Sequence, residues 1–250
     1  MNGSSDNCKV LATVSGKGGA GKSTVASMLG VAFARAGHKT LVIDADEGLR
    51  CLDLMYGMSD LVVFDLGDLL AGNCEAKDAI KQVPNIKNLY LLPAPHSAGK
   101  INNRFAALIE KLRDVFDRII IDSTAGIGKG FNLAASAADE VIAVVGCDPV
   151  SIRDARNVCE LLRDVKESKR RMIINRFDYK ASKSKLIPHI DDIIDSTALQ
   201  LIGIVPYDAV VALGAVNGAP ITKGRGWRAF VRIAHRIDGK NINLPKLSRI

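Results

Sequence analysis

The chain has 250 residues, of which 48% are hydrophobic and 24% are charged, and this balance excludes the disordered and low-complexity classes. The longest stretch without Asp, Glu, Lys or Arg has 14 residues, at 209–222, whereas a membrane-spanning helix needs about 20 apolar residues, so we expect no transmembrane segment. The first residues have neither the basic nor the apolar stretch of a signal peptide. Five cysteines, none spaced as C-x-x-C, predict reduced thiols in a cytoplasmic protein rather than disulfides or a cysteine-bound metal.

The net charge of +7 is concentrated at the C-terminal end of the chain. Residues 221–250 hold eight Lys and Arg and a single acid, Asp238, which leaves 26 residues of each sign in residues 1–220. An anionic partner, either a membrane surface or a nucleic acid, would therefore meet the C-terminus. The basic residues are Lys223, Arg225, Arg228, Arg232, Arg236, Lys240, Lys246 and Arg249.

Short apolar runs alternate along the chain with segments of helical periodicity. Residues 10–14 predict a strand, and residues 23–36 predict the helix that follows, which Gly37 is placed to end. Further strands are predicted over 40–43, 89–92, 119–121, 141–145, 172–174 and 201–205. Further helices are predicted near 101–115, 129–138, 151–166, 208–215 and 226–238.

This alternation indicates the fold class. Strands that alternate with helices form βαβ units, and strands that are apolar on both faces belong to a parallel sheet covered by helices on both sides. We therefore expect an α/β protein with a mostly parallel sheet, forming one domain over residues 1–250 with a flexible N-terminus over 1–7 and a basic tail over 239–250. Ligands of such sheets bind at the carboxyl ends of the strands.

A glycine-rich segment, SGKGGAGKST at 15–24, joins the first predicted strand to the first helix. It fits G-x-x-x-x-G-K-[ST], the P-loop of nucleoside triphosphatases, with Gly16, Gly21, Lys22 and Ser23 in register. In a P-loop the backbone N–H groups cradle phosphate, the lysine contacts the β- and γ-phosphates and the serine binds Mg²⁺. Lys17 is an additional lysine, placed to stabilise charge during transfer as an arginine finger does.

The same glycines allow a second interpretation. Gly16, Gly18 and Gly21 also fit G-x-G-x-x-G, and Asp44 ends the second predicted strand, where a ribose-binding acid of a dinucleotide enzyme would lie. We favour the P-loop because a Lys-Ser pair directly follows the last glycine and because carboxylates after later strands suit Mg²⁺ chemistry.

The segment KGGAGKS at 17–23 resembles the deviant Walker A motif of the MinD/ParA ATPases. Other segments match that family in order and spacing, so that the resemblance covers about residues 8–240 and is best to the MinD branch. These segments are 41–46, 48–54, 88–94, 121–127, 150–155 and 203–208. The chain departs from the MinD pattern at Cys51, where Asn is usual, and at Thr124, where Pro is usual. A cysteine cannot donate the amide hydrogen bond of an asparagine.

The resemblance implies a role for each matching residue. Lys17 would reach across an ATP-bridged dimer to the partner's phosphates, and Asp46 would position the attacking water. Together with Lys22 these form the expected catalytic set, while Ser23, Asp44 and Asp122 form the expected Mg²⁺ set. Thr24 would contact the α-phosphate, and Asn175 and the backbone near Pro206 and Tyr207 would contact adenine. The expected nucleotide-binding residues are Gly18, Gly19, Ala20, Gly21, Lys22, Ser23, Thr24, Asn175, Arg176, Pro206, Tyr207 and Asp208.

The resemblance predicts a Mg²⁺-dependent ATPase that acts as a dimerisation switch for division-site selection. Three alternatives stay open: a ParA-type partition ATPase on DNA, a nucleotide-bound scaffold with little turnover, and a GTP-specific site, because 175–178 read NRFD and come close to the N-K-x-D signature of guanine binding. Regulators resembling MinC and MinE would dock on the helix that begins at Ser151 and carries Arg153 and Asp154.

The C-terminal segment bears on which surface the protein meets. Residues 226–238 predict a helix with one apolar and one basic face, and we favour a core helix with a solvated outer face over a binding element. Pro245 would break a helix in residues 241–250, so we expect no clear targeting helix in this segment. The resemblance still implies a cytoplasmic protein that attaches peripherally to the inner face of the membrane through anionic lipid, with DNA as the less expected surface.

Overall fold

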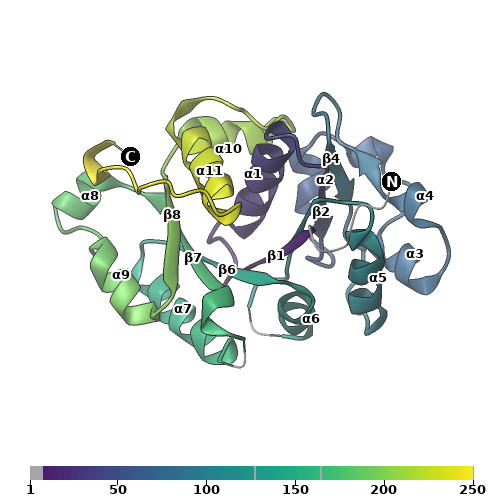
Figure 1. Ribbon diagram of the computed structural model, residues 1–250, viewed down its shortest axis with the longest axis horizontal. Helices are drawn as coiled ribbons and strands as arrows, with labels where there is room; N and C mark the ends of the chain where they lie inside the picture. The colour runs from purple at the N-terminus through teal and green to yellow at the C-terminus, as the bar shows by residue number, and fades with distance from the viewer. Residues whose placement is uncertain (1–7, 127, 164, 250) are drawn as a thin grey trace.

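The computed structural model describes residues 8–126, 128–163 and 165–249, so the flexible segment predicted over 1–7 lies outside the described residues. One eight-stranded sheet forms the centre, in the order β3-β4-β2-β5-β1-β6-β7-β8 (Figure 1). Neighbouring strands are parallel except for β3, which is antiparallel to β4. The strands are β1 Lys9–Val14, β2 Thr40–Asp44, β3 Lys81–Gln82, β4 Leu89–Leu92, β5 Arg118–Asp122, β6 Glu140–Val145, β7 Arg170–Phe177 and β8 Gln200–Pro206.

Helices cover both faces of the sheet, which confirms the expected α/β class (Figure 1). Helices α1 and α11 lie together on one face, and α5, α6, α7 and α9 lie on the other. The helices are α1 Lys22–Arg35, α2 Cys51–Met55, α3 Leu66–Ala71, α4 Ala76–Ala79, α5 Arg104–Arg113, α6 Lys129–Ala137, α7 Pro149–Leu161, α8 Tyr179–Lys183, α9 Ile190–Thr197, α10 Ala209–Val216 and α11 Gly224–Ile237.

The strands supply the core by alternating their side chains between the two faces. In β1, Leu11 packs with the α1 and α11 side, whereas Val10 and Ala12 pack with the α5 and α6 side. Ile120 and its neighbours in β5 divide in the same way. Every strand predicted from an apolar run is present, and the short edge strand β3 is an addition that its two polar residues did not signal.

Two helices begin at other residues than predicted, each beside a side chain that accepts a backbone hydrogen bond. Helix α5 begins at Arg104 rather than near residue 101, and the Asn102 side chain accepts a hydrogen bond from the Arg104 N–H just before it. Helix α7 begins at Pro149, two residues early, because Asp148 caps it and proline fits the first helical position. The short helices α2, α3, α4 and α8, and also α9, were not predicted.

The C-terminal helix α11 is part of the core, as we favoured. Its buried side chains include Phe230 and Ile233, which pack with the α1 side of the sheet. The approach to β8 is close, because a Cβ on Gly203 would lie 2.3 Å from Ile233 Cγ1. Val231, expected on the apolar face, is only half-buried, and Ala229 takes its place. Among the described residues, no helix combines the length and the apolar character needed to cross a membrane.

Candidate nucleotide-binding site

The loop between β1 and α1 has the backbone shape of a phosphate cradle. Gly19 and Gly21 have φ angles of 87° and 85°, in the left-handed region where a side chain is strained. A Cβ on Gly21 would also lie 2.3 Å from Asn175 Nδ2. No side chain in the described ranges caps the start of α1, so its first N–H groups face the loop without a protein acceptor. Such N–H groups and the positive helix end attract an anion.

Two residues of β7 support this loop from behind. Asn175 Nδ2 donates to the Ala20 carbonyl at 2.9 Å, and Arg176 Nη1 donates to the Gly19 carbonyl at 3.0 Å. The pairing of β7 with β8 shifts register between Ile174 and Phe177, and Arg176 has a φ of 58°. An irregularity of this kind re-aims side chains, and here it turns both residues toward the loop.

Lys22 forms the centre of a buried charge cluster. Its Nζ lies 2.8 Å from Asp122 Oδ1 and 3.7 Å from Asp46 Oδ2, and its side chain is only 5% exposed. Burial would lower the pKa of the Lys22 ammonium, but the charge of Asp122 and its hydrogen bond, together with Asp46 and Asp44, raise it. Burial likewise raises the pKa of the Asp46 carboxyl. Lys22 therefore remains charged and keeps the cluster together.

Asp44 is buried beside this cluster and is held by backbone groups. Its two oxygens accept hydrogen bonds from the N–H of Asp46 at 3.0 Å and of Leu52 at 3.1 Å. Burial and the nearby charge of Asp122 raise the pKa of Asp44 to about 7. Asp44 thus fixes both the start of the loop after β2 and the start of α2, and its role toward Mg²⁺ stays a prediction.

Asp122 is suited to accept a hydrogen bond from a water molecule bound to Mg²⁺. Its Oδ1 accepts hydrogen bonds from Lys22 and Thr13, whereas its buried Oδ2 has no hydrogen-bond partner in the described part of the chain. A buried carboxylate oxygen without a donor is costly unless something else satisfies it. A water molecule on Mg²⁺ would do so, and Ser23 supplies a hydroxyl in the adjoining pocket. The residues present therefore suit Mg²⁺ bound together with a nucleotide.

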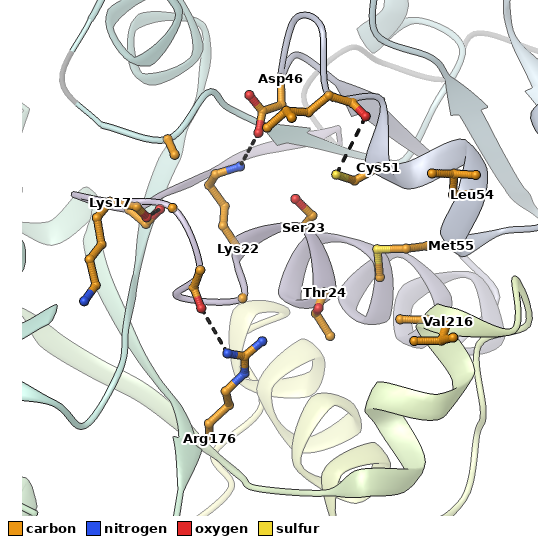
Figure 2. Close-up of a pocket in the computed structure, with 17 residues that line it drawn as sticks. Lys17, Lys22, Ser23, Thr24, Asp46, Cys51, Leu54, Met55, Arg176 and Val216 are labelled. Carbon is orange, nitrogen blue, oxygen red and sulfur yellow. Dashed lines mark hydrogen bonds and ion pairs between the residues drawn. The ribbon is translucent and has the colours of Figure 1, made fainter.

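A pocket of about 520 Å³ opens in front of the loop, a volume within the usual range of ligand sites (Figure 2). Lys22 and Asp46 point toward one another across it, and Lys17 points away from them. Its outer wall is apolar and comes from α2 and α10, where Leu54 is 60% exposed and Val216 is 82% exposed. This apolar rim, defined as Leu49, Leu54, Met55, Ala215 and Val216, was not foreseen from the sequence.

The structure gathers most of the expected residues in this pocket, and those lining it are Lys17, Gly18, Gly19, Gly21, Lys22, Ser23, Thr24, Asp46 and Arg176. Ala20 and Asn175 are buried behind the loop. Pro206 and Tyr207 line a separate hollow of about 290 Å³ with Arg225. Asp208 caps α10 and accepts the Gly226 N–H. The predicted contacts of Asn175, Pro206, Tyr207 and Asp208 with the nucleotide stay predictions.

Lys17 lies at the rim and is tied to the neighbouring helix. Its Nζ lies 3.1 Å from Asp148 Oδ1, at the start of α7. Burial would raise the pKa of Asp148, but hydrogen bonds from the Ser151 hydroxyl and N–H, with the charge of Lys17, lower it to about 2. The Lys17 side chain is thus directed toward α7 and away from Lys22 and Asp46 (Figure 2).

Comparisons with known proteins agree with this site. Residues 11–221 match the model of the CobQ/CobB/MinD/ParA nucleotide binding domain. Septum site-determining protein MinD of Synechocystis sp. is 37% identical, over 94% of this chain and 91% of its own length. The MinC:MinD cell division protein complex of Aquifex aeolicus superposes with a TM-score of 0.88 at 33% identity, covering 96% of this chain and 99% of that chain. MinD of Pyrococcus horikoshii complexed with Mg-ADP gives 0.81 at 28% identity, covering 92% and 96%.

The parallel sheet, the glycine loop and the carboxylates behind it define a P-loop nucleotide hydrolase. The chain belongs to the CobQ/CobB/MinD/ParA family and, within it, to the septum site-determining MinD ATPases. Its activity is the Mg²⁺-dependent hydrolysis of ATP, in the service of division-site selection. These findings favour the MinD interpretation over the ParA-type alternative.

Proposed function

We propose that this chain, as a single ATPase domain, acts as an ATP-driven dimerisation switch at a membrane surface. Two copies close over bound ATP, the dimer binds the membrane and a regulator, and hydrolysis separates the copies. The observation that carries this proposal is the rim of the pocket. There the additional lysine, Lys17, and exposed apolar side chains border the same opening. A second copy would cover both at once.

Residues of this chain account for the hydrolysis step. Phosphoryl transfer requires positioning and charge neutralisation more than covalent chemistry. The N–H groups of the glycine loop and the Lys22 ammonium would hold the phosphates, with Lys22 giving up part of its contact with Asp122 and Asp46. Asp46 lines the pocket and would orient the attacking water. Bound Mg²⁺ neutralises charge on the phosphate oxygens.

The dimer would bury apolar surface that now faces solvent. Leu54 of α2 and Val216 of α10 line the pocket and are 60% and 82% exposed, and Leu213 of α10 is 55% exposed. Exposed apolar clusters of this kind mark interaction surfaces. Lys17, released from Asp148, would then reach the phosphates held by the second copy and tie closure to bound ATP.

Regulators would bind at α7, because this helix contacts the glycine loop directly. Lys17 pairs with Asp148 at the start of α7, and a Cβ on Gly16 would lie 2.6 Å from the Asp154 carbonyl. Val150 and Arg153 are exposed on the same helix. A protein seated on α7 is thereby coupled to the phosphate site. The solved MinC:MinD complex supports a MinC-like partner, and a MinE-like partner is proposed for the same helix.

The membrane contact would be electrostatic and peripheral, on the cytoplasmic side. The exposed cations of α11 and the tail, among them Arg228 and Lys240, give the outer face of the core helix a positive charge. Each such residue contributes about 1 kcal/mol near an anionic leaflet. The tail itself holds only a short 3-10 turn at Leu247–Arg249 in its described part. Two copies in one dimer double the charge that meets the lipid.

The decisive test is the solution mass of an Asp46→Ala variant, measured by light scattering with Mg²⁺ and no nucleotide, ADP, ATP or GTP. We expect a dimer with ATP alone, since the variant should bind ATP but hydrolyse it too slowly for the two copies to separate. A dimer with GTP instead would make Asn175–Asp178 a guanine-binding segment. A monomer in every condition, despite measured ATP binding, would overturn the switch and leave a nucleotide-bound scaffold.

A further inference from the structure

The side chain of Glu47, which follows Asp46 in the loop after β2, accepts three backbone hydrogen bonds from a distant loop. Its Oε1 accepts the N–H of Lys100 at 2.7 Å and of Ile101 at 2.6 Å, and its Oε2 accepts the N–H of Gly99 at 3.0 Å. The donors lie more than fifty positions along the chain, in the loop between β4 and α5. Hydrogen bonds to an ionised carboxylate are among the stronger ones in proteins.

Two further contacts join the same pair of loops. The Gly48 N–H donates to the Pro95 carbonyl at 3.0 Å. The Arg50 guanidinium hydrogen-bonds His96 and also pairs with the buried Asp53 at 2.7 Å. The loop after β4 is itself anchored, because Ile101 is buried in the core beside α5. The loop that carries Asp46 is therefore fixed against a rigid neighbour.

Directly before Glu47, the loop after β2 borders the nucleotide pocket at Asp46. The Asp46 N–H donates to Asp44 at 3.0 Å, and the Asp46 carboxylate lies 3.7 Å from Lys22 Nζ. Glu47 is half-buried, lines no part of that pocket, and is assigned no role by the family motif. A rigid support one residue away would set where the Asp46 carboxylate points.

We propose that Glu47 is a positioning residue for ATP hydrolysis. Its hydrogen bonds to the backbone of residues 99–101 hold Asp46 where the Asp46 carboxylate can orient the attacking water. The inference rests on the proposed role of Asp46. Misplacement of a catalytic group by about 1 Å lowers a rate by up to about 100-fold, so loss of these hydrogen bonds should lower kcat. Phosphate binding by the glycine loop should change little, because the three hydrogen bonds that Glu47 accepts come from residues 99–101 and not from that loop.

The test compares ATP turnover of Glu47→Ala, Glu47→Gln and a matched control, Glu110→Ala. Glu110 is a surface carboxylate that pairs only with Arg113 on its own helix in the described residues. We expect kcat to fall about 10- to 100-fold for Glu47→Ala with KM for ATP changed less than about twofold. Glu47→Gln keeps one carbonyl oxygen for Lys100 and Ile101 and should recover part of the rate. Wild-type kcat in Glu47→Ala, or equal losses in the control, would overturn the proposal.

A double variant separates this inference from the role of Asp46. If Glu47 acts through Asp46, adding Glu47→Ala to Asp46→Ala lowers kcat no further, whereas an independent role gives multiplied losses. If Asp46→Ala itself keeps full turnover, the assumed role of Asp46 is wrong. If Asp46→Ala loses turnover and Glu47→Ala does not, only the inference fails.

Hydrogen exchange on the wild-type protein needs no variant and covers the case in which Glu47→Ala does not fold. Gly99 and Lys100 are exposed residues. Their amides should nevertheless exchange more slowly than those of Ser97 and Ala98 in the same loop, because they donate hydrogen bonds to Glu47. Equal exchange across the loop would show that the contact does not persist, and the proposal would be overturned.

Discussion

The glycine-loop edge of the sheet and the C-terminal helix α11 both carry charge, but they use it differently. At the loop, Lys22 and the carboxylates of Asp44 and Asp122 are buried, and each is held by a specific partner. On α11 most of the apolar side chains are buried, and two of the four arginines, Arg225 and Arg228, are exposed. A buried charge is costly unless it is paired or hydrogen-bonded, whereas an exposed charge contributes little to the stability of the fold. The first region should therefore lose chemistry on mutation, and the second should lose only binding or packing.

The largest effect is expected at Lys22. Replacing it in Lys22→Ala removes the cation of the phosphate site and leaves Asp122 without its 2.8 Å partner. We expect kcat/KM for ATP to fall by at least about 100-fold, measured as phosphate release. The matched control is Lys87→Ala, an exposed lysine outside the pocket, which should keep the wild-type rate. Substantial turnover in Lys22→Ala would contradict the assignment of the P-loop.

The corresponding test of α11 is a loss of packing. Ile233 is 1% exposed and lies against Gly203 of β8, so Ile233→Ala leaves a cavity between helix and sheet. We expect the free energy of unfolding to drop by about 2–5 kcal/mol in urea titrations. Ile233→Val should lower it by about 0.5–1.5 kcal/mol. A neutral Ile233→Ala would mean that α11 is not part of the cooperative core.

The same contrast explains what could be predicted from sequence. The strands and the glycine loop were predictable because their signals are local: apolar runs of strand length, and a fixed spacing of glycines and lysine. Helices α2, α3 and α4 are short and lie in a long connection, where periodicity is too brief to register. The caps that set the start of α7 could be read only weakly, because Asp148 and Pro149 also suit a turn.

The missing site residues depend on neighbours that are remote in the chain. The proposed role of Glu47 depends on its hydrogen bonds to the backbone of residues 99–101. Val216 lines the pocket only because α10 packs beside α2. The side chain of Asn175, whose contact with the nucleotide stays a prediction, donates to the carbonyl of Ala20. A sequence pattern indicates that a polar residue follows a strand, but the register shift that aims this side chain appears only in the fold.

A smaller effect is expected from the exposed cations of α11 and the tail. The double variant Arg228→Gln/Lys240→Gln should weaken sedimentation with anionic phospholipid vesicles at low salt by about 1 kcal/mol per residue, which is roughly fivefold each. The free energy of unfolding should stay within about 0.5 kcal/mol of wild type, because both side chains are exposed. Lys87→Gln/Lys111→Gln, which also removes two exposed charges, is the charge-matched control. Unchanged vesicle binding with weakened DNA binding would favour the ParA-type surface instead.

The smallest effect is expected at the pair of Lys17 with Asp148. This pair combines features of the two regions, because it borders the buried site but is itself exposed. Interactions with Ser151 and Lys17 lower the pKa of Asp148 to about 2, against about 3.9 in an unfolded chain. A lowered carboxyl pKa adds stability above about pH 4 that is lost as the pH falls toward about 2. Asp148→Asn keeps a capping side chain for α7 but should remove this pH dependence.

The size of that change, measured by urea unfolding between pH 2 and pH 5, bears on the switch. Since the Asp148 side chain is 53% exposed, solvent screening should hold the Lys17 contribution below about 1 kcal/mol, and Lys17→Met should reproduce only part of the Asp148→Asn effect. A weak pair lets Lys17 exchange Asp148 for a phosphate at little cost. If Lys17→Met instead removed several kcal/mol, the lysine would be locked in place like Lys22, and its proposed movement to the second copy would be untenable.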